Sequence, residues 1–424
     1  MTYDWYRMDS SALVYPMVLT PNAQSLFRLG VKLTEKVDPR VLKQAVLKAF
    51  RRYPNFKCEL KRGFFRPYLD ENQLPFIVEE DDGLLLKILD FKHNNRYLLR
   101  VTYYGTRIFI DFFHGLCDGS GGMEFLKTVV YYYALLSDIP LSSDNIRTLK
   151  KGQSEEEKED AFKKYYVKPV FSKGVSAMAK GKAFRIRDDY FESGGFGLIQ
   201  ATVGTDKLLV ASRAEDCSVT VLLASIMLQS IAENYISGSY KGNLTVFIPI
   251  NLRKRYQSDT TSNFTVFAKV IIPKNVPITV KSMVPLVKKA LSEQLDKDEI
   301  DLKMGFSSLF TTMPLLRYAP FFVKSLVSKI SRNLAPSKQT FILSNLGKIE
   351  LGKNRLIDGF LFNLNCNKKT PLNVAIVSYG NKTVISFTRK IVPTNVERSF
   401  CRILASYVGK VEVISNFREE CDAL

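Results

Sequence analysis

Strand and helix patterns alternate along almost the whole chain, and this alternation limits the fold to the α/β class. In the first half, apolar residues partly alternate over residues 25–33, as in a strand. A helix is then predicted from Pro39, because Asp38 can cap its free N–H groups and proline suits the first helical position. Residues 97–104 and 107–113 predict a hairpin joined at Gly105-Thr106, and its second strand is mostly apolar and therefore buried.

The second half repeats the alternation, and 424 residues are more than one ordinary domain needs. A charged run over residues 150–160 is interpreted as an exposed linker or mobile helix. The basic, irregular stretch that follows to about residue 190 is the expected crossover between two domains, residues 1–175 and 176–424. The expected strands of the second half are residues 197–203, 244–250, 264–272, 340–344, 359–366, 373–379 and 383–388, and the expected helices are residues 219–235, 278–295, 315–332 and 396–408.

The chain is strongly basic, with 61 lysines and arginines against 42 acidic residues and a formal charge of +19. Such a charge favours anionic partners: nucleic acid, anionic lipid, the phosphates of coenzyme A or an acidic carrier protein. Because the chain has no zinc finger and no aromatic RNA-binding strand motif, a nucleic-acid partner is not expected. A solvated basic surface without a partner stays open as an alternative.

The composition also bears on cofactors and location. The six cysteines are scattered without a Cys-x-x-Cys pair, which argues against structural zinc and a disulfide framework. No apolar stretch is long enough to cross a bilayer, and the first residues do not resemble a secretion signal. We therefore expect a cytoplasmic protein with reduced thiols and no bound metal.

Only two histidines are present, and they differ in context. His93 lies in a polar turn and is expected to be exposed. His114 directly follows the buried strand and precedes a glycine-rich turn and a helix, where α/β proteins place functional groups. Since the pKa of histidine is near neutrality, His114 is a candidate general base, with a purely structural histidine as the alternative.

The segment His114-Gly115-Leu116-Cys117-Asp118-Gly119 resembles the His-x-x-x-Asp-Gly motif of the chloramphenicol acetyltransferase-like superfamily. Two further segments are similar to patterns of its alcohol acetyltransferases and condensation domains: Pro249-Ile250-Asn251-Leu252-Arg253 with Ser262-Asn263-Phe264 downstream, and residues 341–347. The resemblance extends over roughly residues 20–410.

This resemblance implies two chloramphenicol acetyltransferase-like α/β domains, each a mixed sheet with flanking helices, that form a pseudo-dimer around a central tunnel. His114 would be the general base in the tunnel, with acyl donor and acceptor entering from opposite faces. Asp118 and Gly119 would be structural, with Asp118 paired to Arg253, or as second choice to Lys57. The donor would be acyl-CoA as co-substrate, or an acyl carrier protein thioester, and no cofactor is implied.

The chain departs from some branches of the superfamily. Condensation domains usually have a second adjacent histidine, where this chain has Phe113, and the plant branch has an Asp-Phe-Gly-Trp-Gly motif that is absent here. The expected function is therefore that of a stand-alone microbial acyltransferase acting on a small alcohol or amine. A condensation-type enzyme with a carrier-protein donor and a non-catalytic binding module stay open.

Other residues of the motif segments allow competing interpretations. Gly119-Ser120-Gly121-Gly122 could be a phosphate loop, although it lacks the P-loop ending and the dinucleotide spacing. Cys117 could be a nucleophile, but a small packed thiol is favoured. Ser344 and Asn345 could donate hydrogen bonds to an oxyanion, or could serve only the turn before Gly347.

Residues 321–332 combine an apolar stripe with basic residues at helical spacing. The stripe contains Val323, Leu326, Val327 and Ile330, beside Lys324, Lys329 and Arg332. This pattern fits a helix on a membrane surface, so peripheral membrane contact is possible for this chain. An ordinary amphipathic helix with its stripe in the core is the favoured interpretation.

Overall fold

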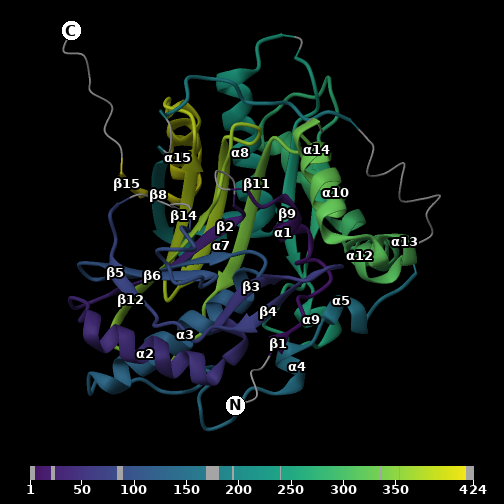
Figure 1. The fold of residues 1–424 in the computed structure, drawn as a ribbon. Coiled ribbons are helices and arrows are strands. Elements are labelled where there is room, and N and C mark those ends of the chain that lie inside the picture. The colour runs from purple at the N-terminus through teal and green to yellow at the C-terminus, as the bar shows by residue number, and fades with distance from the viewer. Residues whose placement is uncertain are drawn as a thin grey trace.

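The computed structural model describes residues 5–20, 24–83, 89–168, 181–192, 195–238, 240–334, 337–352 and 354–416. Two mixed sheets with helices on their outer sides make up most of this part of the chain (Figure 1). The α/β class and the arrangement of two sheets with flanking helices are therefore as predicted. The expected boundary between residues 175 and 176 lies outside the described residues.

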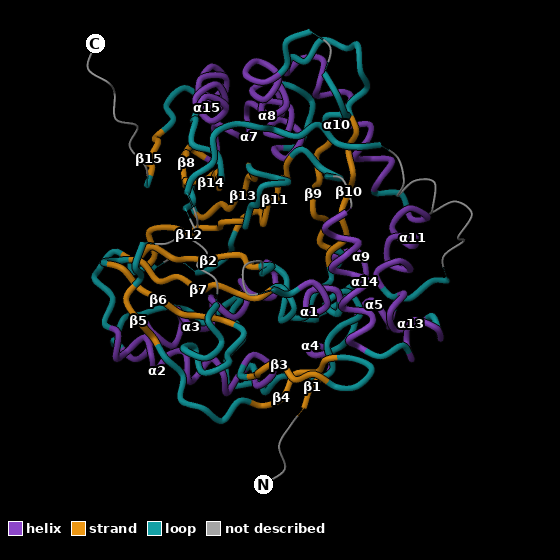
Figure 2. Tube along the Cα trace, turned by 45° about the horizontal axis from the view of Figure 1, so that its top comes forward, coloured by secondary structure: helices purple, strands orange, loops and turns teal. Residues whose placement is uncertain are grey.

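The smaller sheet has the strand order β12-β2-β7-β6-β5, and only β5 and β6 run parallel. The N-terminal helices α2 and α3 lie together on its outer face, and Asp38 caps α2 by accepting from the N–H groups of Arg40 and Val41 (Figure 2). The elements of this layer are β2 (Leu26–Leu33), β5 (Val78–Glu80), β6 (Leu99–Tyr104), β7 (Arg107–Phe113), β12 (Ile357–Leu364), α2 (Pro39–Arg52) and α3 (Gly119–Leu136).

The larger sheet has the strand order β10-β9-β11-β13-β14-β8-β15, in which β9, β11 and β13 are parallel to one another. Its main helices lie on the side that faces away from the smaller sheet (Figure 2). The elements of this layer are β8 (Gly197–Gly204), β9 (Thr245–Asn251), β10 (Thr265–Ile271), β11 (Phe341–Lys348), β13 (Leu372–Tyr379), β14 (Lys382–Arg389), β15 (Glu412–Ser415), α7 (Thr205–Ala214), α8 (Val219–Tyr235), α10 (Val280–Gln294) and α15 (Asn395–Val408).

Strand β12 crosses from the second half of the chain into the sheet of the first half. It pairs antiparallel with β2, for example Phe360 with Val31 and Phe362 with Leu29. All four of these side chains are buried in the core of the first half. The smaller sheet therefore contains a strand that the sequence analysis placed in the domain of residues 176–424.

Most of the charged run over residues 150–160 is exposed, as predicted, but Glu157 is an exception. Glu157 is buried, and its carboxylate accepts two hydrogen bonds from Arg52, at 2.8 and 2.7 Å. Its backbone oxygen also accepts from the N–H and the hydroxyl of Thr261. A carboxylate can be buried here because a guanidinium from α2 neutralises it.

The predicted helix 315–332 consists of two helices, α13 (Pro314–Tyr318) and α14 (Phe321–Leu334), separated at Pro320. The favoured interpretation of its apolar stripe is wrong, because Leu326, Val327 and Ile330 face outward and are at least half exposed. The polar side of α14 faces the protein, where it finds hydrogen-bond partners.

Shorter elements complete the described structure. They are β1 (Trp5–Tyr6), β3 (Cys58–Arg62) and β4 (Pro67–Glu71), which form a three-stranded sheet, and α1 (Val14–Val18), the 3₁₀ turn Pro54–Phe56, α4 (Glu155–Lys158), α5 (Ala161–Lys164), α9 (Arg253–Tyr256), α11 (Lys297–Ser307) and α12 (Leu309–Thr312). No single helix of the described residues could span a membrane by length and composition; α7 and α8 meet that test only as a pair bent by 80°.

Candidate active site

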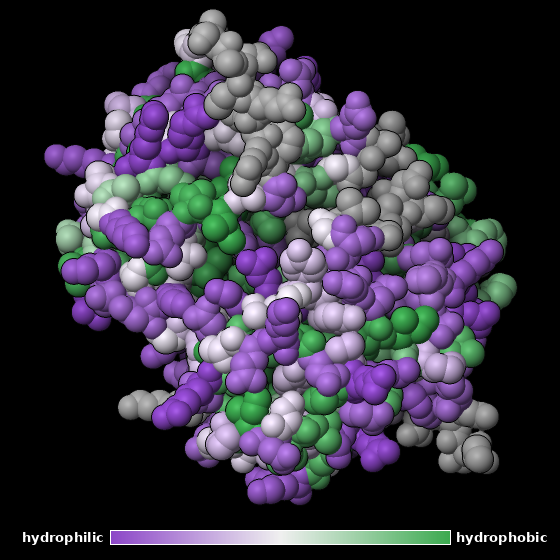
Figure 3. Space-filling view, turned by 90° about the vertical axis from the view of Figure 1, so that its left-hand side faces the viewer, coloured by the Kyte–Doolittle hydropathy of each residue, from purple (hydrophilic) through white to green (hydrophobic). Residues whose placement is uncertain are grey.

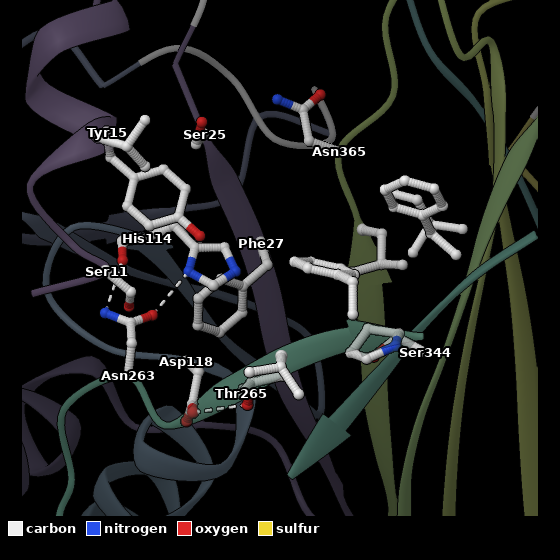
Figure 4. Close-up of a pocket in the computed structure, with 18 of the residues that line it drawn as sticks. Ser11, Tyr15, Ser25, Phe27, His114, Asp118, Asn263, Thr265, Ser344 and Asn365 are labelled. Carbon is white, nitrogen blue, oxygen red and sulfur yellow. Dashed lines mark hydrogen bonds between the residues drawn. The ribbon is translucent and has the colours of Figure 1, made fainter. Parts of the chain in front are cut away.

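A cavity of about 1870 Å³ lies between the two halves of the molecule. Residues of β9, β10 and β11 from the larger sheet line it, together with residues of β2 and β12 from the smaller sheet and of α1 and α11. Residues from both halves of the chain therefore surround the same space. His114 and Ser344 both border this cavity (Figure 4).

His114 is held at the end of β7 by its backbone and by two aromatic rings. The backbone N–H of His114 donates to the backbone oxygen of Ser25 at 2.8 Å, which extends the pairing of β2 and β7 by one residue. The ring of Tyr15 stacks on the imidazole with centroids 4.7 Å apart, and Phe27 meets it edge-on at 5.1 Å. These contacts fix the plane of the imidazole beside the cavity.

Asn263 decides which nitrogen of His114 carries the proton. The Asn263 amide nitrogen donates to the backbone oxygen of His114 at 3.1 Å and to Asp9 at 2.9 Å, so its Oδ1 must act as acceptor toward the imidazole. His114 Nδ1 lies 3.0 Å from this oxygen and therefore carries the hydrogen. Nε2 is then the unprotonated nitrogen, and Figure 4 shows it directed into the cavity.

The environment of His114 favours its neutral form. Burial lowers the pKa of His114 below 6.5, and the charge of Asp118 and the bond to Asn263 only partly oppose this effect. A neutral imidazole with a free Nε2 can accept a proton at neutral pH. The arrangement therefore has the charge state that a general base requires.

Asp9 positions Asn263 from the N-terminal segment. Asp9 Oδ2 accepts from both the backbone and the side-chain nitrogen of Asn263, at 3.1 and 2.9 Å. Burial and the nearby charge of Asp160 raise the pKa of Asp9 to about 6. Asp9 and Tyr15 were missed by the sequence analysis, and Asn263 was noticed only within a segment similar to the superfamily, with no role assigned.

Asp118 points away from the imidazole and forms a bidentate ion pair with Arg253, with both distances 2.9 Å. All five donors of Arg253 are used, because it also donates to the backbone oxygens of Thr260 and Ser262 and to Asn251 Oδ1. The guanidinium holds the pKa of Asp118 below its usual range. The pairing is the first of the two predicted, while Lys57 lies beside Glu71 instead.

The carboxylate of Asp118 also caps the N-terminus of helix α3. Asp118 Oδ1 accepts from the N–H of Gly121, and Oδ2 accepts from the N–H of Phe264 and the hydroxyl of Thr265. A Cβ on Gly121 would lie 2.0 Å from the backbone oxygen of Thr261, so only glycine fits there. Because Asp118 occupies the helix N-terminus that a phosphate would need, the geometry argues against a phosphate loop.

Cys117 is a packed thiol and not an activated nucleophile. Its side chain is fully buried, and burial together with the charge of Asp118 raises the pKa of Cys117 well above its usual value. A thiol must lose its proton to attack a carbonyl. The favoured interpretation, a small buried side chain, agrees with this environment.

Gly119, Ser344 and Asn345 also border the cavity. Ser344 is a largely buried residue of β11, further along the cavity from His114 (Figure 4). The amide of Asn345 is occupied, since Nδ2 donates to Thr220 and Oδ1 accepts from the N–H of Gly347, whose φ is +76°. Asn345 therefore stabilises the turn. The Ser344 hydroxyl, in contrast, forms no hydrogen bond with another described residue.

Basic residues dominate the charged lining of the cavity away from His114. Among the described residues, six lysines and arginines line it, against the three acidic residues Asp118, Glu293 and Glu299, of which Asp118 is paired with Arg253. The basic residues are Lys269, Lys303, Arg332, Lys338, Lys368 and Lys390. In the part of the chain that the structure describes, no group of three or more His, Cys, Asp or Glu could hold a metal ion.

This chain has the chloramphenicol acetyltransferase-like fold, because solved structures of that fold match its mixed sheets and flanking helices over nearly the whole chain. Polyketide synthase associated protein 5 from Mycobacterium tuberculosis is 13% identical, with a TM-score of 0.62 over 95% of this chain and 97% of that chain. TRI101 of F. sporotrichioides, solved with coenzyme A and T-2, is 10% identical, with a TM-score of 0.63 over 97% and 99% of the two chains.

The epimerization domain of the third module of tyrocidine synthetase B is also similar. It is 11% identical, with a TM-score of 0.60 over 96% of this chain and 97% of that chain. No protein-family model matches the chain, and no curated protein matches it in sequence. The likeness therefore concerns the fold.

Proposed function

We propose that this protein is an acyltransferase that moves an acyl group from a thioester to an alcohol or amine, with His114 as general base. The observation that carries the proposal is the tautomer of His114: Asn263 accepts from Nδ1, so the basic Nε2 faces a large cavity. The similar fold of a solved trichothecene 15-O-acetyltransferase, TRI3 from Fusarium sporotrichioides, supports it.

In the proposed reaction, Nε2 removes the proton of the acceptor as its oxygen or nitrogen attacks the thioester carbonyl. The tetrahedral intermediate then collapses, the carbon–sulfur bond breaks, and the thiolate takes the proton from the imidazolium. Asn263 Oδ1 stabilises the positive ring through Nδ1–H. Ser344 is proposed as a hydrogen-bond donor to the substrate or the oxyanion, whereas Asp118, Gly119 and Arg253 maintain the loop.

Acyl-CoA is the proposed donor, because the six basic residues that line the cavity suit a phosphate-bearing molecule. The structure of TRI101 contains coenzyme A, and a similar starter condensation domain was solved with C8-CoA. A carrier-protein thioester is the second candidate, since condensation domains share the fold. The proposed location is the cytoplasm, where the free thiols of Cys58, Cys117 and Cys366 would remain reduced.

The test is thiol release from acyl-CoA in the presence of a panel of alcohols and amines. His114→Ala should keep the fold and lower turnover by about 10²-fold or more. His93→Ala is the matched control, because His93 is exposed and lies beside Glu79, away from the cavity. A folded His114→Ala variant with normal turnover would refute the proposed base, and the absence of turnover with every donor would favour a non-catalytic module.

A further inference from the structure

Helix α14 presents its apolar stripe to the outside of the molecule. Phe322, Leu326 and Val327 are 69%, 59% and 60% exposed, and Val323 and Ile330 lie on the same side. A helix on the surface of a folded protein normally turns such a stripe toward the core. The orientation of α14 is the reverse of that arrangement.

Hydrogen bonds from the opposite, polar side of α14 fix this orientation. Lys324 is buried, and its Nζ donates to the backbone oxygens of Phe65 and Arg317, at 2.9 and 3.1 Å. Ser325 and Arg332 donate to backbone oxygens of α1, at 2.8 and 2.9 Å. Rotating the helix to bury its stripe would break all these bonds, so the outward stripe is part of the fold.

The exposed stripe continues onto two neighbouring segments. The tip of the β3–β4 hairpin joins it, because the N–H of Phe321 donates to Phe64 at 2.8 Å and Phe65 contacts Tyr318 edge-on at 6.2 Å. The whole set is called the α14 surface and consists of Phe64, Phe65, Leu315, Tyr318, Phe322, Val323, Leu326, Val327 and Ile330, each at least 39% exposed.

Exposed apolar side chains are more dispersed on another face of the molecule. On the face that Figure 3 shows, which is the left-hand side of Figure 1, hydrophobic residues form separate groups among hydrophilic ones. Large contiguous apolar patches on a folded chain indicate a contact with another apolar surface. The α14 surface therefore requires an occupant.

The charges around the α14 surface identify the kind of occupant. From residue 302 to residue 349 the chain has seven lysines and arginines and no acidic residue, but Lys303, Arg332 and Lys338 line the cavity and Lys324 is buried. At the surface itself, Arg317 is exposed between Leu315 and Tyr318, and Arg62 and Arg66 are exposed beside the two phenylalanines of the hairpin tip, whereas Lys61 is paired with Glu59. Exposed apolar side chains beside exposed arginines fit the interface of a bilayer, where acyl chains lie beside anionic headgroups.

We propose that the α14 surface docks the protein on anionic lipid bilayers, with α14 lying in the plane of the interface. The surface lies beside the cavity, because Arg332 of α14 lines the cavity and α14 packs against α1, which contributes Val14 and Val18 to the lining (Figure 2). Docking would thus hold the side of the cavity formed by α1 close to the membrane. This binding is independent of catalysis by His114.

The test is flotation of the full chain with vesicles of phosphatidylcholine and phosphatidylserine, and with vesicles of phosphatidylcholine alone. The wild-type protein should bind the anionic vesicles, and binding should weaken with added salt. Leu326→Glu/Val327→Glu should reduce the bound fraction by about tenfold or more, because both side chains leave the apolar contact. Both residues are exposed, so the fold should tolerate the change.

Val413→Glu/Ile414→Glu is the matched control, because these β15 residues are 50% and 51% exposed and the variant adds the same charge. Its binding should equal that of the wild type, and so should that of His114→Ala. A second measurement uses Phe322→Trp in a Trp5→Phe background, where Trp5 is the only natural tryptophan. The tryptophan emission of this variant should shift to shorter wavelength when anionic vesicles are added.

Three results would overturn the proposal. They are no binding of the wild type to anionic vesicles, equal loss of binding in the α14 and β15 variants, and a tryptophan emission of the Phe322→Trp variant that anionic vesicles leave unchanged. A dimer of the wild type that Leu326→Glu/Val327→Glu dissociates, without vesicle binding, would instead assign the α14 surface to a second copy of the chain.

Discussion

Replacing Asn263 with alanine tests the chain of contacts that prepares His114. The side chain of Asn263 accepts from His114 Nδ1 and donates to Asp9 and to the backbone oxygen of His114. In the ground state, the bond to Nδ1 joins two neutral groups. Once Nε2 has taken a proton the ring is positive, so the same bond becomes stronger in the transition state.

The size of the effect follows from this difference. A hydrogen bond to a charged group contributes about 1.5–3 kcal/mol and a neutral one about 0.5–1.5 kcal/mol, so the bond gains about 1–1.5 kcal/mol in the transition state. Since about 1.4 kcal/mol of barrier corresponds to tenfold in rate, Asn263→Ala should lower kcat roughly 5- to 13-fold, while KM for the donor changes little. The assay is steady-state thiol release, with thermal unfolding to confirm that the variant is folded.

The pH dependence provides a readout that a purely structural role would not change. The wild-type pKa of His114 is lowered, so the acidic limb of its pH–rate profile should lie below pH 6.5. Because the bond to Asn263 raises the pKa of His114, its loss in Asn263→Ala should move that limb to lower pH. Asn365→Ala is the control, since Asn365 borders the same cavity but donates to Gln24. A normal kcat in Asn263→Ala, or a limb displaced to higher pH, would refute this reasoning.

Three further expectations concern the loop, the thiol and the donor. Arg253→Ala should lower the free energy of unfolding by about 3–5 kcal/mol, measured by urea unfolding, because Asp118 would stay buried without its partner; an unchanged unfolding midpoint would contradict the structural role of the pair. Cys117→Ala should leave thiol release unchanged. If a folded Cys117→Ala variant no longer released thiol, covalent catalysis by Cys117 would be favoured instead. The KM for acyl-CoA should rise as the Debye length falls from about 10 Å at 0.1 M salt to about 3 Å at 1 M, whereas a pantetheine thioester should be insensitive; equal behaviour of the two donors would mean that the basic lining binds something else.

Local sequence was sufficient to predict the strand, turn and helix around His114. The apolar run of β7, the glycines after His114 and the apolar face of α3 act over neighbouring residues, so their pattern could be read directly. The exposed position of His93 was predicted for the same reason, from the polar turn around it. The pairing of Asp118 with Arg253 came from the resemblance to a superfamily, since 135 residues separate the two partners.

The surroundings of His114 could not be predicted in the same way. Asp9 and Tyr15 come from the N-terminal segment and Asn263 comes from the second half of the chain, all far from His114 in the sequence, and only tertiary packing brings them to the imidazole. None of them belongs to a pattern of apolar spacing or a charged run. The buried pair of Arg52 and Glu157 was hidden likewise, because a charged residue in a polar segment gives no sign that a distant guanidinium neutralises it.

The apolar stripe of α14 and the position of β12 show most clearly what the sequence could not predict. Helical spacing of apolar residues determines that Leu326 and Ile330 share a face, but it is the same whether that face meets the core or the outside. The backbone oxygens that receive hydrogen bonds from Lys324 and Ser325 decided the direction. The sequence pattern likewise predicted a strand over residues 359–366, which the structure places at Ile357–Leu364. Only the pairing with β2 decided which sheet it joins, because backbone hydrogen bonds do not depend on the side chains of the paired residues.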